Sequence, residues 1–176
     1  YDHTIDCPPL NNPMFNWSKI GIEGIKSGNK NLNTIDNIMQ YNGHLGRSDM
    51  ILKCDIEGSE WEMLEHMNVE NLACFKQIVI ELHFFDKIDD ANFYETVYKA
   101  VSNLTEVHKV IHVHANNFGA YNIVGGVPVP SVIELTLFRE EEGRIMVPSG
   151  ELFPNYLDMP CNKDEADYYL GTFTFF

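Results

Sequence analysis

Positive charge is scarce in this chain of 176 residues, which has 12 Lys and Arg residues against 26 Asp and Glu residues. The formal net charge is therefore −14. A surface this acidic repels phosphate backbones, so we expect no nucleic acid among the partners of the protein. Long apolar runs are also missing, since none approaches the roughly 18 residues that a membrane-spanning helix needs. We therefore expect no membrane span.

Closely spaced cysteines are missing as well, which argues against a CxxC redox pair and a zinc ribbon. Cys54 lies in an apolar run and reads as a small core residue, which favours free thiols over two disulfides. Glycosylation sequons begin at Asn16 and Asn103, but they matter only in a secretory compartment. We expect a cytoplasmic protein, with the lumen of the secretory pathway as the alternative if the chain is a processed fragment. The four cysteines are Cys7, Cys54, Cys74 and Cys161.

What the chain does have is an alternation of apolar runs and helix-period segments. The run at 50–54 is almost continuously apolar, as in a parallel strand that is buried on both faces. Apolar residues at 92–104 repeat at helical spacing instead. Trp61, at helical spacing, is predicted to be a core residue. Strands are predicted at 17–22, 50–54, 77–82, 107–113 and 132–138, and helices after the N-caps Thr34 and Ser59 and at 92–104.

This alternation predicts an α/β fold with a Rossmann-like, doubly wound sheet. The last two strands are joined by a Gly/Pro-rich link at 125–130 without a helical pattern, so we expect them to form an antiparallel pair. Residues 1–148 form the predicted core, and residues 149–176 form a polar, turn-rich tail that packs on it. Ligands of such sheets bind beyond the carboxyl ends of the strands.

Polar side chains follow three of the predicted strands at the point where each strand ends. Acid and imidazole groups at neighbouring strand ends are expected to meet at one edge of the sheet. An Asp/Glu/His group there also suits a divalent ion, although we leave a metal unassigned. These residues are Asp55 and Glu57 after the strand at 50–54, Glu81 and His83 at the end of the strand at 77–82, and His114 after the strand at 107–113.

The segment 51–64, ILKCDIEGSEWEML, resembles the K-x-D-x-E-G-x-E-x-x-x-L signature of the FkbM-type S-adenosylmethionine-dependent methyltransferases. Weaker matches follow the same order along nearly the whole chain. Residues 1–4 resemble the acidic end of the second strand of that fold, and 19–22 resemble the third strand. Residues 81–83 resemble the E-x-H after the fifth strand, and 154–161 resemble a tail motif of the group.

The resemblance implies S-adenosylmethionine as cofactor. It assigns Asp2 to the ribose hydroxyls, because one carboxylate accepts from two vicinal hydroxyls. Gly21 would let the backbone pass close to the adenine, and Asp55 would point toward the transferred methyl group. Asp36 is a further cofactor candidate, although an acid in the first turn of a helix is also favoured by the helix dipole. The glycine-rich loop of the family would lie upstream of Tyr1, so we expect the first strand of the fold to be missing from the given sequence.

The implied reaction is O-methylation of a hydroxyl on a sugar or a polyketide-like natural product, so the expected partner is a small-molecule or glycan acceptor. Asp55 would hold the nucleophile or a metal ion, and His83 or His114 would take the hydroxyl proton. Glu57, in the turn that follows the strand at 50–54, is a further catalytic candidate.

Two alternatives stay open. One is a degenerate methyltransferase-like domain that binds a partner without catalysis. The other is a metal-dependent hydrolase that uses the same acids and histidines.

Overall fold

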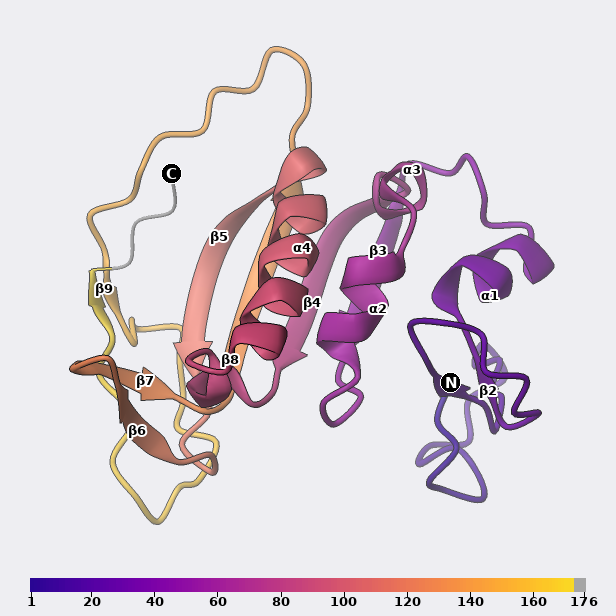
Figure 1. Ribbon diagram of the computed structural model, residues 1–176. Helices are drawn as coiled ribbons and strands as arrows, with labels where there is room; N and C mark the ends of the chain where they lie inside the picture. Colours follow the sequence, from indigo (N-terminus) through magenta and orange to yellow (C-terminus); the bar gives the residue numbers. More distant parts are fainter. Residues whose placement is uncertain (173–176) are drawn as a thin grey trace.

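The computed structural model describes residues 1–172, and its centre is a four-stranded mixed sheet in the order β3-β4-β8-β5 (Figure 1). Strand β3 runs parallel to β4, whereas β8 is antiparallel to both of its neighbours, β4 and β5. The predicted α/β class and the predicted antiparallel pair are thus confirmed. The strands are β3 (Met50–Cys54), β4 (Phe75–Leu82), β5 (His108–Ala115) and β8 (Ile133–Arg139).

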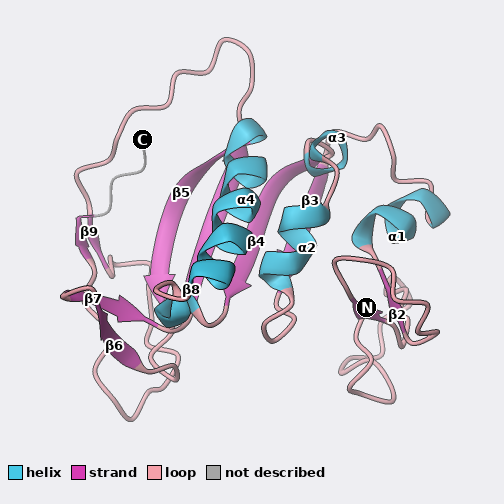
Figure 2. Cartoon of the chain, viewed as in Figure 1, coloured by secondary structure: helices cyan, strands magenta, loops and turns pink. Residues whose placement is uncertain are grey.

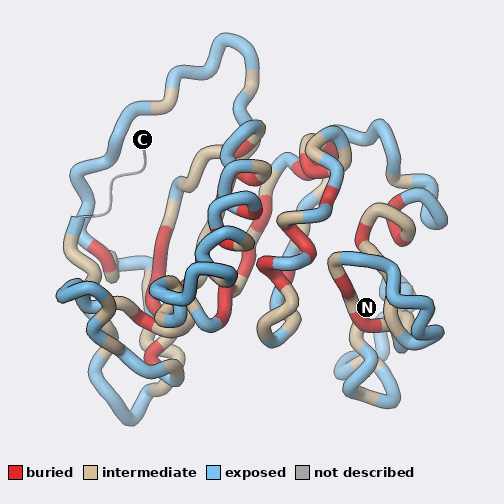
Figure 3. Tube along the Cα trace, in the orientation of Figure 1, coloured by how far each residue is buried: buried red, intermediate tan, exposed pale blue. Residues whose placement is uncertain are grey.

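Two helices, α2 (Glu60–His66) and α4 (Ala91–Val107), pack against each other and lie along the same face of this sheet (Figure 2). The short α3 (Val69–Leu72) leads into β4, and the 3₁₀ helix η1 (Phe85–Lys87) follows that strand. Alternate residues of β4 point toward the helices and are buried (Figure 3). Trp61 is only 2% exposed, which confirms it as a core residue. The largest core cluster includes Cys54, Leu64, Ile78, Ile80, Leu82, Ala100 and Leu104.

The N-terminal part lies beyond β3 in Figure 1, and Ile35 and Met39 of its helix belong to the same core cluster. Its strands β1 (Gly21–Ile22) and β2 (Leu32–Asn33) pair in parallel, so the strand predicted at 17–22 shrinks to two residues. Helix α1 (Ile35–Tyr41) begins as predicted, because the Thr34 side chain accepts a hydrogen bond from the Asn37 amide. Within residues 1–172, β3 therefore has a strand neighbour on one side only.

Ser59 is the N-cap residue of α2, as predicted, but its side chain makes no capping bond. The carboxylate of Glu60 instead accepts the Gly58 amide at 3.0 Å and the Ile56 amide at 2.8 Å. The first turn of α2 thus supplies its own acceptor for the loop that enters it.

The Gly/Pro-rich link hides a hairpin that the sequence analysis did not predict. Strands β6 (Tyr121–Val124) and β7 (Val127–Pro130) pair antiparallel around Gly125 and Gly126. Both glycines have positive φ, at 57° and 84°, which a two-residue hairpin turn of this kind requires. The hairpin sits below the sheet in the view of Figure 1.

The tail contains a second short pair, β9 (Leu152–Phe153) with β10 (Gly171–Thr172). It returns to the sheet, where Asp158 lies 2.7 Å from Nε2 of His112 on β5. Residues 173–176 of the predicted tail lie outside the described residues.

All four cysteines are free. No helix in residues 1–172 is long and apolar enough to cross a membrane. The side-chain nitrogen of Asn103, the acceptor residue of one sequon, donates to the carbonyls of Leu64 and Glu65 at 3.0 Å each. In the folded chain that nitrogen joins α4 to α2 and is not free to carry a glycan.

Candidate functional site

A row of ionisable residues crosses the four-stranded sheet, and we call Asp55, Glu81, Glu134 and His114 the cross-strand row. Glu81 of β4 pairs with Glu134 of β8, which pairs with His114 of β5. Asp55 directly follows Cys54, the partner of Ile80. Cross-strand partners point to the same face, and the neighbouring residues Cys54 and Ile80 pack with the helices. The row therefore lies on the face opposite the helices, where the parallel strands β3 and β4 end.

The turn between β3 and α2 is held in an unusual backbone conformation. Glu57 has φ 56° and Gly58 has φ 110°, and both values lie in the left-handed region that favours glycine. A Cβ atom at Gly58 would clash with the ring of Phe84. Glu60 is fully buried and stabilises this turn through the two backbone amides that it accepts. Such strain is typical of functional turns.

His83 is held from two sides by helix α2. Its Nδ1 atom lies 3.2 Å from Oε1 of Glu60, and its backbone carbonyl accepts the Trp61 indole N–H at 2.6 Å. Its Nε2 atom faces Glu57 and Glu81, each at 3.5 Å. With the Nδ1 proton donated to Glu60, a neutral ring has Nε2 free to accept a proton. Sequence reasoning selected His83 but missed its orienting partner Glu60.

Asp55, Glu81 and His83 lie together, with one ligand atom of each within 4.8 Å of the others. Asp55 is exposed, Glu81 is half-buried and His83 is buried. Burial raises the pKa of Glu81, and the nearby Asp55 and Glu134 carboxylates raise it further. The Asn116 amide donates to Glu81 at 3.1 Å. Oxygen and imidazole ligands at this spacing suit a divalent cation.

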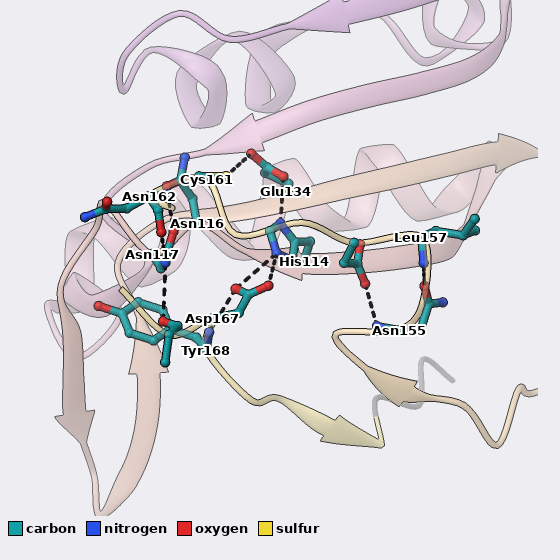
Figure 4. A network of polar contacts seen from close by, with 12 residues as sticks. His114, Asn116, Asn117, Glu134, Asn155, Leu157, Cys161, Asn162, Asp167 and Tyr168 are labelled. Atoms are coloured by element: carbon teal, nitrogen blue, oxygen red, sulfur yellow. Dashed lines mark hydrogen bonds and ion pairs between the residues drawn. The ribbon is translucent and has the colours of Figure 1, made fainter. Parts of the chain in front are cut away.

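His114 has a different environment, shown in Figure 4. Its Nδ1 lies 3.0 Å from Oε2 of Glu134, and its Nε2 lies 3.0 Å from Oδ2 of Asp167 in the tail. The hydrogen bond with Glu134, followed by that with Asp167, raises the pKa of His114 to about 9, although burial opposes this. A ring that is protonated at neutral pH cannot accept a proton, so His114 is unsuited to act as the base.

Cys161 of the tail completes this second group. Its thiol donates to Oε1 of Glu134 at 3.5 Å. Burial raises the pKa of Cys161 to about 11, with the carboxylate of Glu134 as the next cause. No local pattern in the sequence points to this group, because Glu134 lies 20 residues from His114 and 27 residues from Cys161 along the chain.

The three other cofactor candidates lie in the N-terminal part. Asp2 accepts from the amide and hydroxyl of Thr4 through Oδ1, which lowers its pKa, and its Oδ2 has no hydrogen-bond partner within residues 1–172. Gly21 is covered, since a Cβ atom there would meet the ring of His3. Both carboxylate oxygens of Asp36 accept from α3 and its cap, from the Asn68 amide at 3.1 Å and from the Asn71 side chain at 2.9 Å. Asp36 thus joins α1 to α3.

Comparisons with protein-family models, with curated proteins and with solved structures found no match for this chain. The function of this chain is therefore inferred from the site itself and from the motif at 51–64.

Proposed function

We propose that this protein is an S-adenosylmethionine-dependent O-methyltransferase with a Rossmann-like core. The single observation that carries the proposal is the contact between Glu60 and His83 beside Asp55. It joins the K-x-D-x-E-G-x-E motif to the E-x-H motif at the carboxyl end of two parallel strands. These are the two motifs that resemble the FkbM-type family. Ligands of open α/β sheets bind at this end of the strands.

The Rossmann-like part of the proposal is supported by the unit β3-α2-α3-β4. Its two strands are parallel and are connected through helices, as in the repeating unit of doubly wound sheets. Within residues 1–172, the outer edge of β3 pairs with no other strand, as expected for an edge to which a further strand could add.

The chain's own residues would act on the acceptor hydroxyl. Bound S-adenosylmethionine would supply a methyl group on a sulfonium, which is a good leaving group. The acceptor hydroxyl would donate its one hydrogen bond to Nε2 of His83, which takes the proton as the oxygen attacks. Asp55 would position the acceptor by accepting a hydrogen bond from a second hydroxyl of the same molecule. Glu60 is a positioning residue, because it holds Nδ1 and stabilises the charged ring that results. Glu57, 3.5 Å from Nε2, would bring further negative charge near that ring.

The cofactor candidates fit unequally. Asp2 fits the ribose, since it is a carboxylate with one oxygen uncommitted within residues 1–172. Gly21 and Asp36 fit less well, because His3 covers the first and α3 engages the second. We therefore assign the ribose contact to Asp2 and propose no adenine contact from Gly21 or Asp36.

The proposed acceptor is a hydroxyl of a small molecule or glycan. The formal charge of −14 and the acidic row disfavour a phosphorylated acceptor. The proposed compartment is the cytoplasm, which the four free cysteines suit.

The test is transfer of a labelled methyl group to a panel of sugars and hydroxylated natural products by the full-length protein. We expect labelled product from at least one acceptor and its loss in Asp55→Asn. Cofactor binding without transfer to any acceptor would instead support the non-catalytic binding module.

A second candidate is favoured by the spacing of Asp55, Glu81 and His83, whose ligand atoms lie within 4.8 Å of one another. These residues would hold a divalent ion in a metal-dependent hydrolase. Metal-stimulated hydrolysis of ester substrates, without any binding of S-adenosylmethionine, would support this candidate over the first.

A further inference from the structure

The second ionisable group combines three types of metal ligand on the face of the sheet opposite the helices. His114 comes from β5, Glu134 from β8 and Cys161 from the tail, and one ligand atom of each lies within 4.8 Å of the others. Figure 4 shows that the three side chains converge from separate segments. His114 is buried, and the other two are half-buried. A nitrogen, an oxygen and a sulfur ligand together are typical of a zinc site.

The spacing of these atoms is close to what zinc requires. Tetrahedral zinc with bonds of 2.0–2.3 Å separates its ligand atoms by roughly 3.3–3.7 Å. Here, Nδ1 of His114 lies 3.0 Å from Oε2 of Glu134, and Sγ of Cys161 lies 3.5 Å from Oε1. One ligand atom of each residue lies within 4.8 Å of the others, so the three ligands draw closer together when they bind one ion.

Asp167 has the position of an outer partner. It contacts Nε2 of His114, the ring nitrogen on the side away from Glu134, at 3.0 Å. Histidines that bind a metal through one nitrogen usually donate the other N–H to a carboxylate, which fixes the ring. Asp167 would thus orient His114 without binding the ion.

The charges of the neighbours also favour a cation. Glu81 and Glu134 lie directly opposite each other on adjacent strands, an arrangement of like charges that destabilises a sheet unless it is neutralised. The His114 ring, 3.0 Å from Glu134, offsets part of this repulsion in the ion-free chain, and a divalent ion on Glu134 would take over that role.

We propose that His114, Glu134 and Cys161 form a zinc site, with a fourth position open to water. The site is distinct from the group Asp55–Glu81–His83 and does not depend on methyl transfer. Because Cys161 belongs to the tail and the other two ligands belong to the sheet, zinc binding fixes the tail against the sheet beside the candidate active site.

The experiment is a titration of the chelator-treated, full-length protein with Co²⁺ and Zn²⁺. Cobalt bound to a thiolate shows a sulfur-to-metal charge-transfer band in the near ultraviolet. We expect one equivalent of ion and this band in the wild type. Cys161→Ser should abolish the band and weaken Zn²⁺ binding at least about 10-fold, and Asp167→Asn should keep the band but weaken binding by about 10- to 100-fold.

Two matched controls make the result specific. Cys7→Ser changes an exposed thiol outside the group, and His112→Gln breaks the tail contact with Asp158 without removing a ligand. Both should keep the charge-transfer band. The proposal is overturned if the wild type shows no saturable binding. It is also overturned if Cys161→Ser and His114→Gln both bind the ion as tightly as the wild type does. Binding that survives Cys161→Ser but is lost in Asp55→Asn would place the ion at the other group and also overturn it.

Discussion

Glu60 of α2 and His83 at the end of β4 are in direct contact, with Oε1 of the acid 3.2 Å from Nδ1 of the ring. Glu60 is fully buried, and the same carboxylate accepts the backbone amides of Ile56 and Gly58. One side chain therefore sets both the shape of the turn after β3 and the orientation of the proposed base. Any change at Glu60 should reach both.

His83→Ala should lower methyl transfer by about 10²- to 10⁴-fold, the usual contribution of a general base. Affinity for S-adenosylmethionine should stay nearly constant, because the base acts on the acceptor. Turnover and calorimetric affinity of the same preparations check this. His66→Ala, at an exposed histidine of α2, is the control and should behave as the wild type. A fall of only a few-fold in His83→Ala would mean that another group takes the proton.

Glu60→Gln should lower both stability and turnover. Glutamine has one acceptor oxygen where the carboxylate has two, so a buried amide or the His83 ring loses its partner, at a cost of about 1–3 kcal/mol. Thermal melts measure the first effect, and the pH profile of turnover measures the second, because the ring loses the acid that holds Nδ1. Glu70→Gln, at an exposed acid of α3, should change neither. An unchanged pH profile in folded Glu60→Gln would exclude the positioning role.

Gly58→Ala should be more destabilising than Gly143→Ala. Both glycines have positive φ, at 110° and 80°, and a left-handed backbone costs an L-residue roughly 1–2 kcal/mol. Only at Gly58 does the new methyl group also meet a neighbour, the Phe84 ring, whereas Gly143 faces open space. Urea unfolding of the two variants compares them directly. Equal losses of stability would show that the ring of Phe84 moves aside freely.

Local patterns in the sequence predicted the elements that depend on local chemistry. The apolar run at 50–54, the Thr34 cap and the helical repeat at 92–104 are found with small shifts of their ends. The hairpin at 121–130 was missed although Gly125-Gly126 is a turn signal. The reason is that β7 contains two prolines, Pro128 and Pro130, and proline argues against a strand.

The site was predictable only in part, because only some of its residues follow a local pattern in the sequence. Strand ends pointed to Asp55, Glu81, His83 and His114. The partners of His114 could not be found, since Asp167 lies 53 residues away and reaches the sheet only through the fold of the tail. Ser59 occupies the predicted N-cap position but makes no capping bond, and Glu60, one residue later, accepts the loop amides of Ile56 and Gly58 instead.

Stability of the chelator-treated protein should fall as the pH rises from about 6.5 to above 9. His114 has its pKa raised to about 9 by Glu134 and Asp167, from an ordinary value of 6.5. A histidine whose pKa is higher in the folded chain than in the unfolded chain stabilises the fold fully at a pH below the unfolded pKa. This contribution to stability is lost as the pH rises through the folded pKa. Thermal melts at pH 6.5 to 8 stay below the ordinary pKa of 9.0 near which Cys161 titrates in the unfolded chain. His114→Gln should flatten this slope, and His66→Gln should keep it. An equal slope in His114→Gln would assign the effect to another group.

The central claim is that this protein binds S-adenosylmethionine, and calorimetric titration of the full-length protein tests it without knowledge of the acceptor. We expect saturable binding of S-adenosylmethionine and of S-adenosylhomocysteine. Asp2→Ala should weaken both by about 1–3 kcal/mol, since hydroxyls of the ribose lose their partner. Asp6→Ala, at an exposed acid of the same segment, should bind as the wild type does. Absence of binding to either compound in the folded wild-type protein would contradict the account.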